Sequence, residues 1–202
     1  VQDVEQAQQA VAATRYPPRG IRGVGGTTRG NRFGRISDYF SGIEDETAVI
    51  VQVETLSALA QAENIAAVDG IDGVFFGPAD IAADMGLLGR HMDPNVWEAI
   101  WAVAHKLIAK GVPVGTLVSD VAFARKLLAD GFTFVACGSD IGLLAKGADA
   151  LLAQARDQAR CGNLHARFKC VAICCPAFTA LVFHYSDSHG AVNSVCSNSE
   201  CP

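Results

Sequence analysis

The chain has 202 residues, a formal net charge of −5, 50% hydrophobic residues and only 18% charged residues. The negative charge, and basic residues that lack an interleaved array of aromatic side chains, argue against nucleic-acid binding. A largely apolar run at 170–183 contains Pro176 and is too short for a bilayer, so no membrane segment is predicted. The body of the chain has a lone cysteine, Cys137, which is typical of a cytoplasmic protein.

The first predicted element is a helix over 3–13, which begins with a capping-box-like pair, Asp3 and Gln6. A segment rich in Gly, Pro and Arg follows at 15–42. It holds six arginines: Arg15, Arg19, Arg22, Arg29, Arg32 and Arg35. Two interpretations stay open. The arginines could attract an anionic substrate, or the segment is a solvated loop that packs at a subunit contact, which we favour.

Beyond this segment, short apolar runs alternate with helical patterns. Runs at 48–54, 72–77, 112–117 and 132–138 are typical of buried strands, and helices are predicted at 56–68, 94–110, 120–130 and 140–158. Thr55 is the expected N-cap of one helix, and Asp93 followed by Pro94 begins the next. Strands that alternate with helices predict an α/β fold with a parallel sheet.

Two carboxylates, Glu54 and Asp80, follow two successive predicted strands. The carboxyl ends of parallel strands meet at one edge of a sheet, where α/β proteins bind their ligands. Because neighbouring strands lie about 4.8 Å apart, the two acids would repel each other unless a cation lay between them. A hard divalent metal is the natural candidate. The alternative is that Glu54 caps a helix or forms an ion pair, and that Asp80 only begins the next helix.

Neighbouring residues favour the functional interpretation. Gln52 shares a strand face with Glu54, because side chains alternate along a strand. The segment 77–80 (GPAD) is predicted to be a rigid turn of low bulk. Such a turn exposes backbone N–H groups beside Asp80, where a small anionic substrate could approach closely.

The segments 49–55 (VIVQVET) and 70–86 (GIDGVFFGPADIAADMG) resemble the metal-dependent class II pyruvate aldolases typified by 4-hydroxy-2-oxoheptanedioate aldolase. The 2-dehydro-3-deoxyglucarate aldolases belong to the same group, and citrate lyase beta subunits are more distant relatives. The likeness continues through 14–18 and 20–25 upstream and through 115–117 and 134–140 downstream. It therefore covers residues 1–156.

This resemblance implies a (β/α)8 TIM barrel of the phosphoenolpyruvate/pyruvate type, of which residues 1–158 would form the last four βα units. It implies cleavage of a 4-hydroxy-2-oxo acid to pyruvate and an aldehyde through a metal-stabilised pyruvate enolate, in aromatic or sugar-acid catabolism. Glu54 and Asp80 would bind Mg²⁺, Mn²⁺ or Co²⁺, and Gln52, Ala79 and Asp80 would bind the small-molecule 2-oxo acid. The full-length enzyme is expected to be a homo-oligomer.

No catalytic residue is predicted within the chain. The general base of the family, a His, and its enolate-stabilising Arg are expected before Val1, so this chain alone is expected to be inactive. His91 follows a site strand but is predicted to be a surface loop residue. A Schiff-base mechanism is not predicted, because no lysine is expected at a strand end. The lysines fall instead in predicted helices or in the tail: Lys106, Lys110, Lys126, Lys146 and Lys169. The alternatives are an inactive barrel fragment or a lyase acting on an acyl-CoA ester.

The character of the sequence changes near residue 160, and the family likeness stops. Residues 159–202 hold six of the seven cysteines: Cys161, Cys170, Cys174, Cys175, Cys196 and Cys201. No paired C-x2-C framework supports a zinc site there, and a disulfide framework fits poorly with a cytoplasmic body. This tail is predicted to be irregular or disordered and unrelated to the barrel.

Overall fold

A computed structural model describes residues 1–160 of the chain. The chain divides into two units, Val1–Gly138 and Ser139–Pro202. The second unit contributes one described helix, α7 (Asp140–Arg160), where a helix over 140–158 was predicted. The predictions made for the cysteine-rich tail concern residues outside the described part. None of the helices in residues 1–160 combines the length and apolar character needed to cross a membrane.

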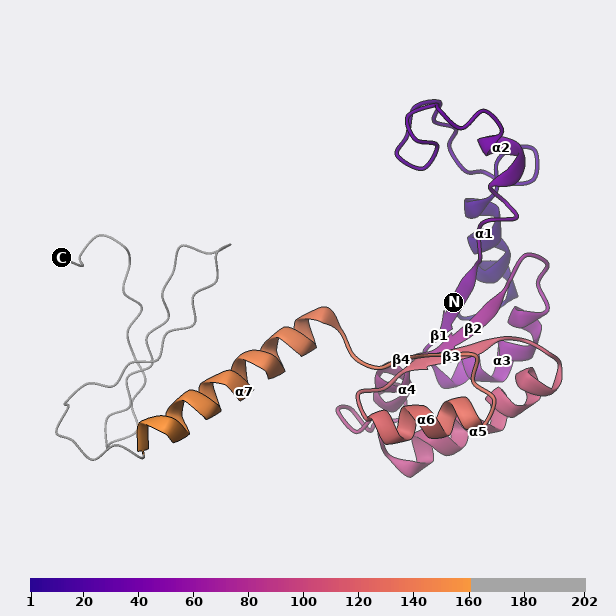
Figure 1. Ribbon diagram of the computed structural model, residues 1–202. Coiled ribbons are helices and arrows are strands. Elements are labelled where there is room, and N and C mark those ends of the chain that lie inside the picture. The colour runs from indigo at the N-terminus through magenta and orange to yellow at the C-terminus, as the bar shows by residue number, and fades with distance from the viewer. Residues whose placement is uncertain (161–202) are drawn as a thin grey trace, which may run out of the picture. The chain divides into compact units, whose positions relative to one another are not determined.

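The first unit is built on a parallel sheet, as predicted. Its strands are β1 (Ile50–Val53), β2 (Gly73–Phe76), β3 (Val114–Leu117) and β4 (Phe134–Ala136). They lie in chain order β1-β2-β3-β4 (Figure 1). Pairing is in register: Val53 lies beside Phe76, and Phe76 beside Thr116. The carboxyl ends of β1 and β2 are therefore adjacent.

The four longest helices of this unit begin and end within a few residues of the predicted bounds. They are α1 (Val4–Thr14), α3 (Leu56–Ala66), α5 (Pro94–Ala109) and α6 (Val121–Ala129). Asp3 and Thr55 are N-caps, as predicted, and each accepts from the backbone amide of the third residue of its helix. Short polar side chains at these positions satisfy amides that a helix leaves without partners.

Two short helices were not predicted: α2 (Tyr39–Gly42) and α4 (Pro78–Asp84). The second corrects the prediction of a turn at 77–80. Gly77 is the N-cap of α4 and Pro78 its first residue, so Asp80 lies in the first turn of a helix. Proline suits the first helical position because its ring fixes a helical φ angle. It also has no N–H group, and an N–H group at that position would find no acceptor within the helix. The local pattern G-P is a helix start here rather than a turn.

The two faces of the sheet differ. Helices α3, α4, α5 and α6 lie on one side (Figure 1), and the side chains on that face are almost fully buried: Val51, Val53, Val74, Phe76, Val114 and Thr116. On the other face, Ile50 is 47% exposed and Leu117 42% exposed. The ring of Phe134 lies over Gly115, where a Cβ atom would come within 2.0 Å of Phe134 Cε2. We call these the covered face and the open face.

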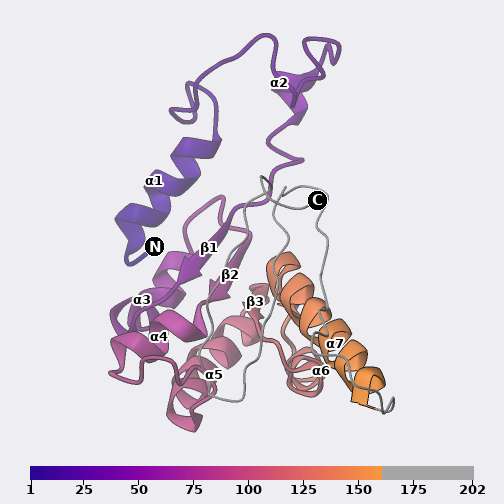
Figure 2. The same ribbon diagram turned by 90° about the vertical axis from the view of Figure 1, so that its left-hand side faces the viewer.

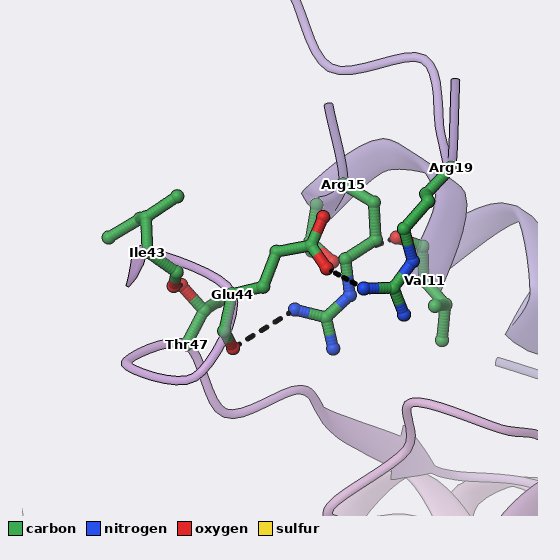
Figure 3. A network of polar contacts seen from close by, with 7 residues as sticks. Val11, Arg15, Arg19, Ile43, Glu44 and Thr47 are labelled. Atoms are coloured by element: carbon green, nitrogen blue, oxygen red, sulfur yellow. Dashed lines mark hydrogen bonds and ion pairs between the residues drawn. The ribbon is translucent and has the colours of Figure 1, made fainter. Parts of the chain in front are cut away.

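The arginine-rich segment forms a long loop between α1 and β1. Figure 2 shows α1 beside α3, with the loop that carries α2 extending from its end. The loop is closed at its base, where Glu44 forms an ion pair with Arg19 and its carbonyl oxygen accepts from Arg15 at 3.2 Å (Figure 3). Two of the six arginines thus hold the loop ends together. This supports the structural interpretation for Arg15 and Arg19.

Candidate functional site

Glu54 and Asp80 converge on one point beside Gly77. A Cβ atom placed on Gly77 would lie 2.9 Å from Glu54 Cγ, 3.3 Å from Glu54 Oε1 and 3.5 Å from Asp80 Oδ2. Glu54 follows β1 directly, and Asp80 reaches the same place from the first turn of α4. The space that glycine leaves free is the space that the Glu54 side chain occupies. Two acids from different elements are therefore brought together at the strand ends.

Neither acid has a cationic side chain as partner within residues 1–138, the first unit. The ion pairs of this part of the chain use the carboxylates of Glu44, Glu63 and Asp93 instead. Glu54 is half-buried and Asp80 is exposed. Adjacent carboxylates without a protein cation repel each other, and a bound cation would relieve that repulsion. Carboxylate oxygens are ligands that Mg²⁺ and Mn²⁺ prefer.

The two acids have no third protein partner of the usual metal-binding kinds in the described residues. No group of three His, Cys, Asp or Glu side chains there is placed to hold one ion. A cation held by Glu54 and Asp80 would therefore keep several positions for water or a ligand. Such partial coordination by one or two carboxylates is common for Mg²⁺ sites that also bind substrate.

Gln52 and Ala79 flank the acids. Burial alternates along β1, with Ile50 and Gln52 exposed and Val51 and Val53 buried. Gln52 is therefore on the open face, two residues before Glu54. Ala79 is exposed and is the second residue of α4, so its N–H group has no acceptor within an α-helix. A small side chain leaves that amide accessible.

The backbone around Gly77 is held from both neighbouring strands. Gly77 N donates to Val53 O at 3.1 Å, and the buried hydroxyl of Thr116 donates to Phe76 O at 3.0 Å. These bonds fix the peptide that leads from β2 into α4. A fully buried threonine hydroxyl must find an acceptor, and here that acceptor lies one residue before the N-cap of α4.

Sequence reasoning placed Gly77 in the low-bulk segment beside Asp80 but missed that its lack of a side chain admits Glu54. It also missed Asp84, whose Oδ2 accepts from Leu56 N at 2.8 Å. Asp80 and Asp84 are four residues apart, a spacing that places two side chains on one face of a helix. Recognising 78–84 as helical would have revealed this spacing.

The described histidines do not join the two acids. His91 is exposed, and its carbonyl oxygen accepts from Trp97 Nε1 at 3.0 Å. His105 is inside α5 and stacks on Trp101 at 5.1 Å between ring centroids. Lys106 and Lys126 lie in helices, as predicted, and Lys110 directly follows α5. No lysine within the described residues therefore lies at a strand end.

The chain is similar in sequence to known aldolases. The chain is 50% identical over 159 residues to the hydroxypyruvate/pyruvate aldolase of Cupriavidus necator, a match that covers 78% of this chain and 59% of that protein. It is 48% identical over 155 residues to the 4-hydroxy-2-oxo-heptane-1,7-dioate aldolase of Salmonella paratyphi B, covering 76% and 59%. The chain thus spans about three fifths of the length of these relatives.

Solved structures and family models give the same result. A crystal structure of an HpcH/HpaI aldolase/citrate lyase family protein from Burkholderia cenocepacia matches with a TM-score of 0.72 at 36% identity, covering 77% of this chain and 62% of that one. The HpcH/HpaI aldolase/citrate lyase family model matches residues 1–147, which include β1 to β4 and both acids. On this match and these identities, the chain belongs to the HpcH/HpaI aldolase/citrate lyase family.

Proposed function

We propose that this chain carries the metal-binding and pyruvate-binding part of an aldolase that cleaves a 4-hydroxy-2-oxo acid to pyruvate and an aldehyde. Glu54 and Asp80 hold a divalent cation, Mg²⁺, Mn²⁺ or Co²⁺. In this proposal the four βα units are the second half of a (β/α)8 barrel. The observation that carries the proposal is the convergence of the two carboxylates at Gly77.

The donor set fits such a cation. Two carboxylates from adjacent strand ends supply hard oxygen ligands, and neither is paired with a cationic side chain within residues 1–138. When bound, the cation supplies positive charge that stabilises a pyruvate enolate as the C–C bond breaks. The protein's contribution is to hold both carboxylates in place before the substrate arrives, which lowers the reorganisation needed during the reaction.

Gln52 and Ala79 would bind and orient the 2-oxo acid. The Gln52 amide on the open face can donate to a substrate oxygen, and the Ala79 N–H group at the start of α4 can donate to its carboxylate. The positive end of a helix favours an anion at that position, although α4 is short and its dipole correspondingly small. The small Ala79 side chain leaves room for the substrate carbon chain.

The names of the relatives support the substrate class. Both curated relatives are named as aldolases of 2-oxo acids, one for pyruvate and hydroxypyruvate and one for a 4-hydroxy-2-oxo diacid. Pyruvate is common to these chemistries, and the aldehyde differs. The proposal therefore assigns the pyruvate portion to the residues described above, and it assigns no general base to His91 or His105.

Pyruvate release tests the proposal directly. The chain would be assayed alone and joined behind the N-terminal segment of the Cupriavidus necator relative, with a 4-hydroxy-2-oxo acid and Mn²⁺. The joined protein should release pyruvate in a reaction that EDTA stops. Glu54→Gln and Asp80→Asn should each slow it by about 1000-fold, since a metal supplies several kcal/mol of charge stabilisation.

Glu46→Gln is the matched control, because Glu46 is an exposed acid outside the site. It should release pyruvate at the rate of the unchanged protein. EDTA-sensitive release that survives either site substitution would refute the ligand assignment. A joined protein that folds and binds Mn²⁺ yet releases no pyruvate would refute the aldolase activity.

A further inference from the structure

Helix α4 carries a second acid, Asp84, which is exposed but whose carboxylate also accepts a hydrogen bond from another helix. Its Oδ2 atom accepts a hydrogen bond from Leu56 N at 2.8 Å, across 28 residues of chain. Leu56 is the first residue of α3 and lies two residues after Glu54. The contact therefore joins the helix that carries Asp80 to the turn that carries Glu54.

The chemistry of this contact is favourable. The first amides of a helix have no acceptor within the helix. In α3, Thr55 Oγ1 accepts from Ala58 N at 3.1 Å, and Asp84 accepts from Leu56 N. A carboxylate at a helix N-terminus is also stabilised by the helix dipole. Asp84 thus acts as a second cap of α3, supplied by a different helix.

This bond and a backbone hydrogen bond next to the strands lie on either side of the two candidate metal ligands. On the strand side, Gly77 N donates to Val53 O at 3.1 Å. On the helix side, Asp84 binds Leu56 N. Glu54 lies between Val53 and Leu56, and Asp80 lies between Gly77 and Asp84. Both acid-bearing segments are therefore tied to each other before and after the acid.

Asp84 does not act as a third ligand in this arrangement. No three His, Cys, Asp or Glu side chains of the described residues are placed around one ion. One oxygen of Asp84 is already bonded to an amide. Its hydrogen bond connects it to Glu54 through the backbone of the β1–α3 turn.

We propose that Asp84 is a positioning residue that fixes the β1–α3 turn against α4, and with it the placement of Glu54 relative to Asp80. The inference rests on the proposed metal site. It predicts that loss of the Asp84–Leu56 bond loosens that turn and weakens cation binding, although Asp84 is not itself a proposed metal ligand. A conservative substitution that keeps an acceptor oxygen should preserve part of both properties.

Three variants of the full chain test the proposal: Asp84→Ala, Asp84→Asn and the control Asp120→Ala. Asp120 is also a helix cap, accepting from Phe123 N at 2.6 Å, but it caps α6, which follows β3 rather than β1 or β2. The readouts are hydrogen exchange of the Leu56 amide without metal, Mn²⁺ affinity by electron paramagnetic resonance, and thermal unfolding. Glu54→Gln serves as the reference for loss of the metal site.

Asp84→Ala should speed exchange at Leu56 and raise the dissociation constant for Mn²⁺ about tenfold, the lower end of what outer-shell substitutions cost. Asp84→Asn keeps an oxygen acceptor and should fall between Asp84→Ala and the unchanged chain. Asp120→Ala should lose comparable thermal stability with Mn²⁺ affinity unchanged. If Asp84→Ala fails to fold, the same comparison is made with Asp84→Asn.

The outcomes separate the two proposals. Unchanged Mn²⁺ affinity in the Asp84 variants, with binding still lost in Glu54→Gln, would overturn the positioning role and leave the metal site standing. Equal weakening by Asp120→Ala would reduce the effect to general destabilisation and would also overturn it. Mn²⁺ binding that is insensitive to Glu54→Gln would overturn the metal site, and the role of Asp84 with it.

Discussion

The covered and open faces of the sheet differ in burial and in the kind of residue that they carry. On the covered face, rows such as Val53, Phe76 and Thr116 lie side by side under α3, α5 and α6 and are excluded from solvent. On the open face, Gln52 is exposed and Glu54 follows at the same parity along β1. Most of the buried core thus lies on the covered face, whereas Gln52 lies on the open face and Asp80 reaches the site from the first turn of α4.

Truncation of one isoleucine on each side should give the largest difference in stability. Ile100 of α5 is fully buried against the covered face, whereas Ile50 on the open face is 47% exposed. Ile100→Ala should lower the free energy of unfolding by about 2–5 kcal/mol. Ile50→Ala should lower it by less than about 1 kcal/mol. Urea unfolding measures both free energies, and equal losses would contradict the proposed difference between the two faces.

A methyl group added at Gly77 should affect the site more than the fold. The new Cβ would lie 2.9 Å from Glu54 Cγ, which is closer than side chains normally pack, so Glu54 must move. Gly77→Ala should weaken Mn²⁺ binding by about tenfold or more. Its effect on the urea midpoint should be smaller than that of Ile100→Ala.

Gly23→Ala is the control for this substitution, because a Cβ there would meet no atom within 4 Å. It should leave Mn²⁺ affinity unchanged. Gly77→Ala with full Mn²⁺ affinity would show that the space beside Gly77 is not needed to bring the two acids together.

The smallest expected effect concerns Glu63, which forms surface ion pairs with Lys106 and Lys110. The hydrogen bond from Lys110, at 2.6 Å, and the nearby Lys106 lower the pKa of Glu63 from its ordinary value of 4.5. Because the pKa is lower in the folded state, this stabilisation is present above pH 4.5. It is lost as the pH falls through the folded-state pKa. These pairs join α3 to α5 and do not reach the site.

Thermal unfolding of Glu63→Gln across pH checks this sign. The midpoint should lie slightly below that of the unchanged chain at neutral pH, and the gap should close at acidic pH. Glu98→Gln is the control, because Glu98 takes part in none of the ion pairs of the described residues. A gap that widens on acidification would contradict the assignment.

The sequence pattern was sufficient for the strands and long helices, because β-branched runs and capping residues such as Thr55 act locally. It was insufficient for α4, because a Gly-Pro pair is compatible with both a turn and the start of a helix. Glu54 and Asp80 could be proposed from strand-end position alone. The space that Gly77 leaves for the Glu54 side chain and the Asp84–Leu56 bond could not, because both depend on how two segments more than 20 residues apart pack together.

Binding of Mn²⁺ to the full chain tests the central claim, that Glu54 and Asp80 together form a divalent-cation site. Electron paramagnetic resonance should detect one bound Mn²⁺ per chain, displaced by Mg²⁺. Glu54→Gln and Asp80→Asn should each weaken binding by about 100-fold or more, since each removes one of two charged ligands, whereas Glu46→Gln should not. Mn²⁺ affinity that is the same in all three variants would contradict the claim.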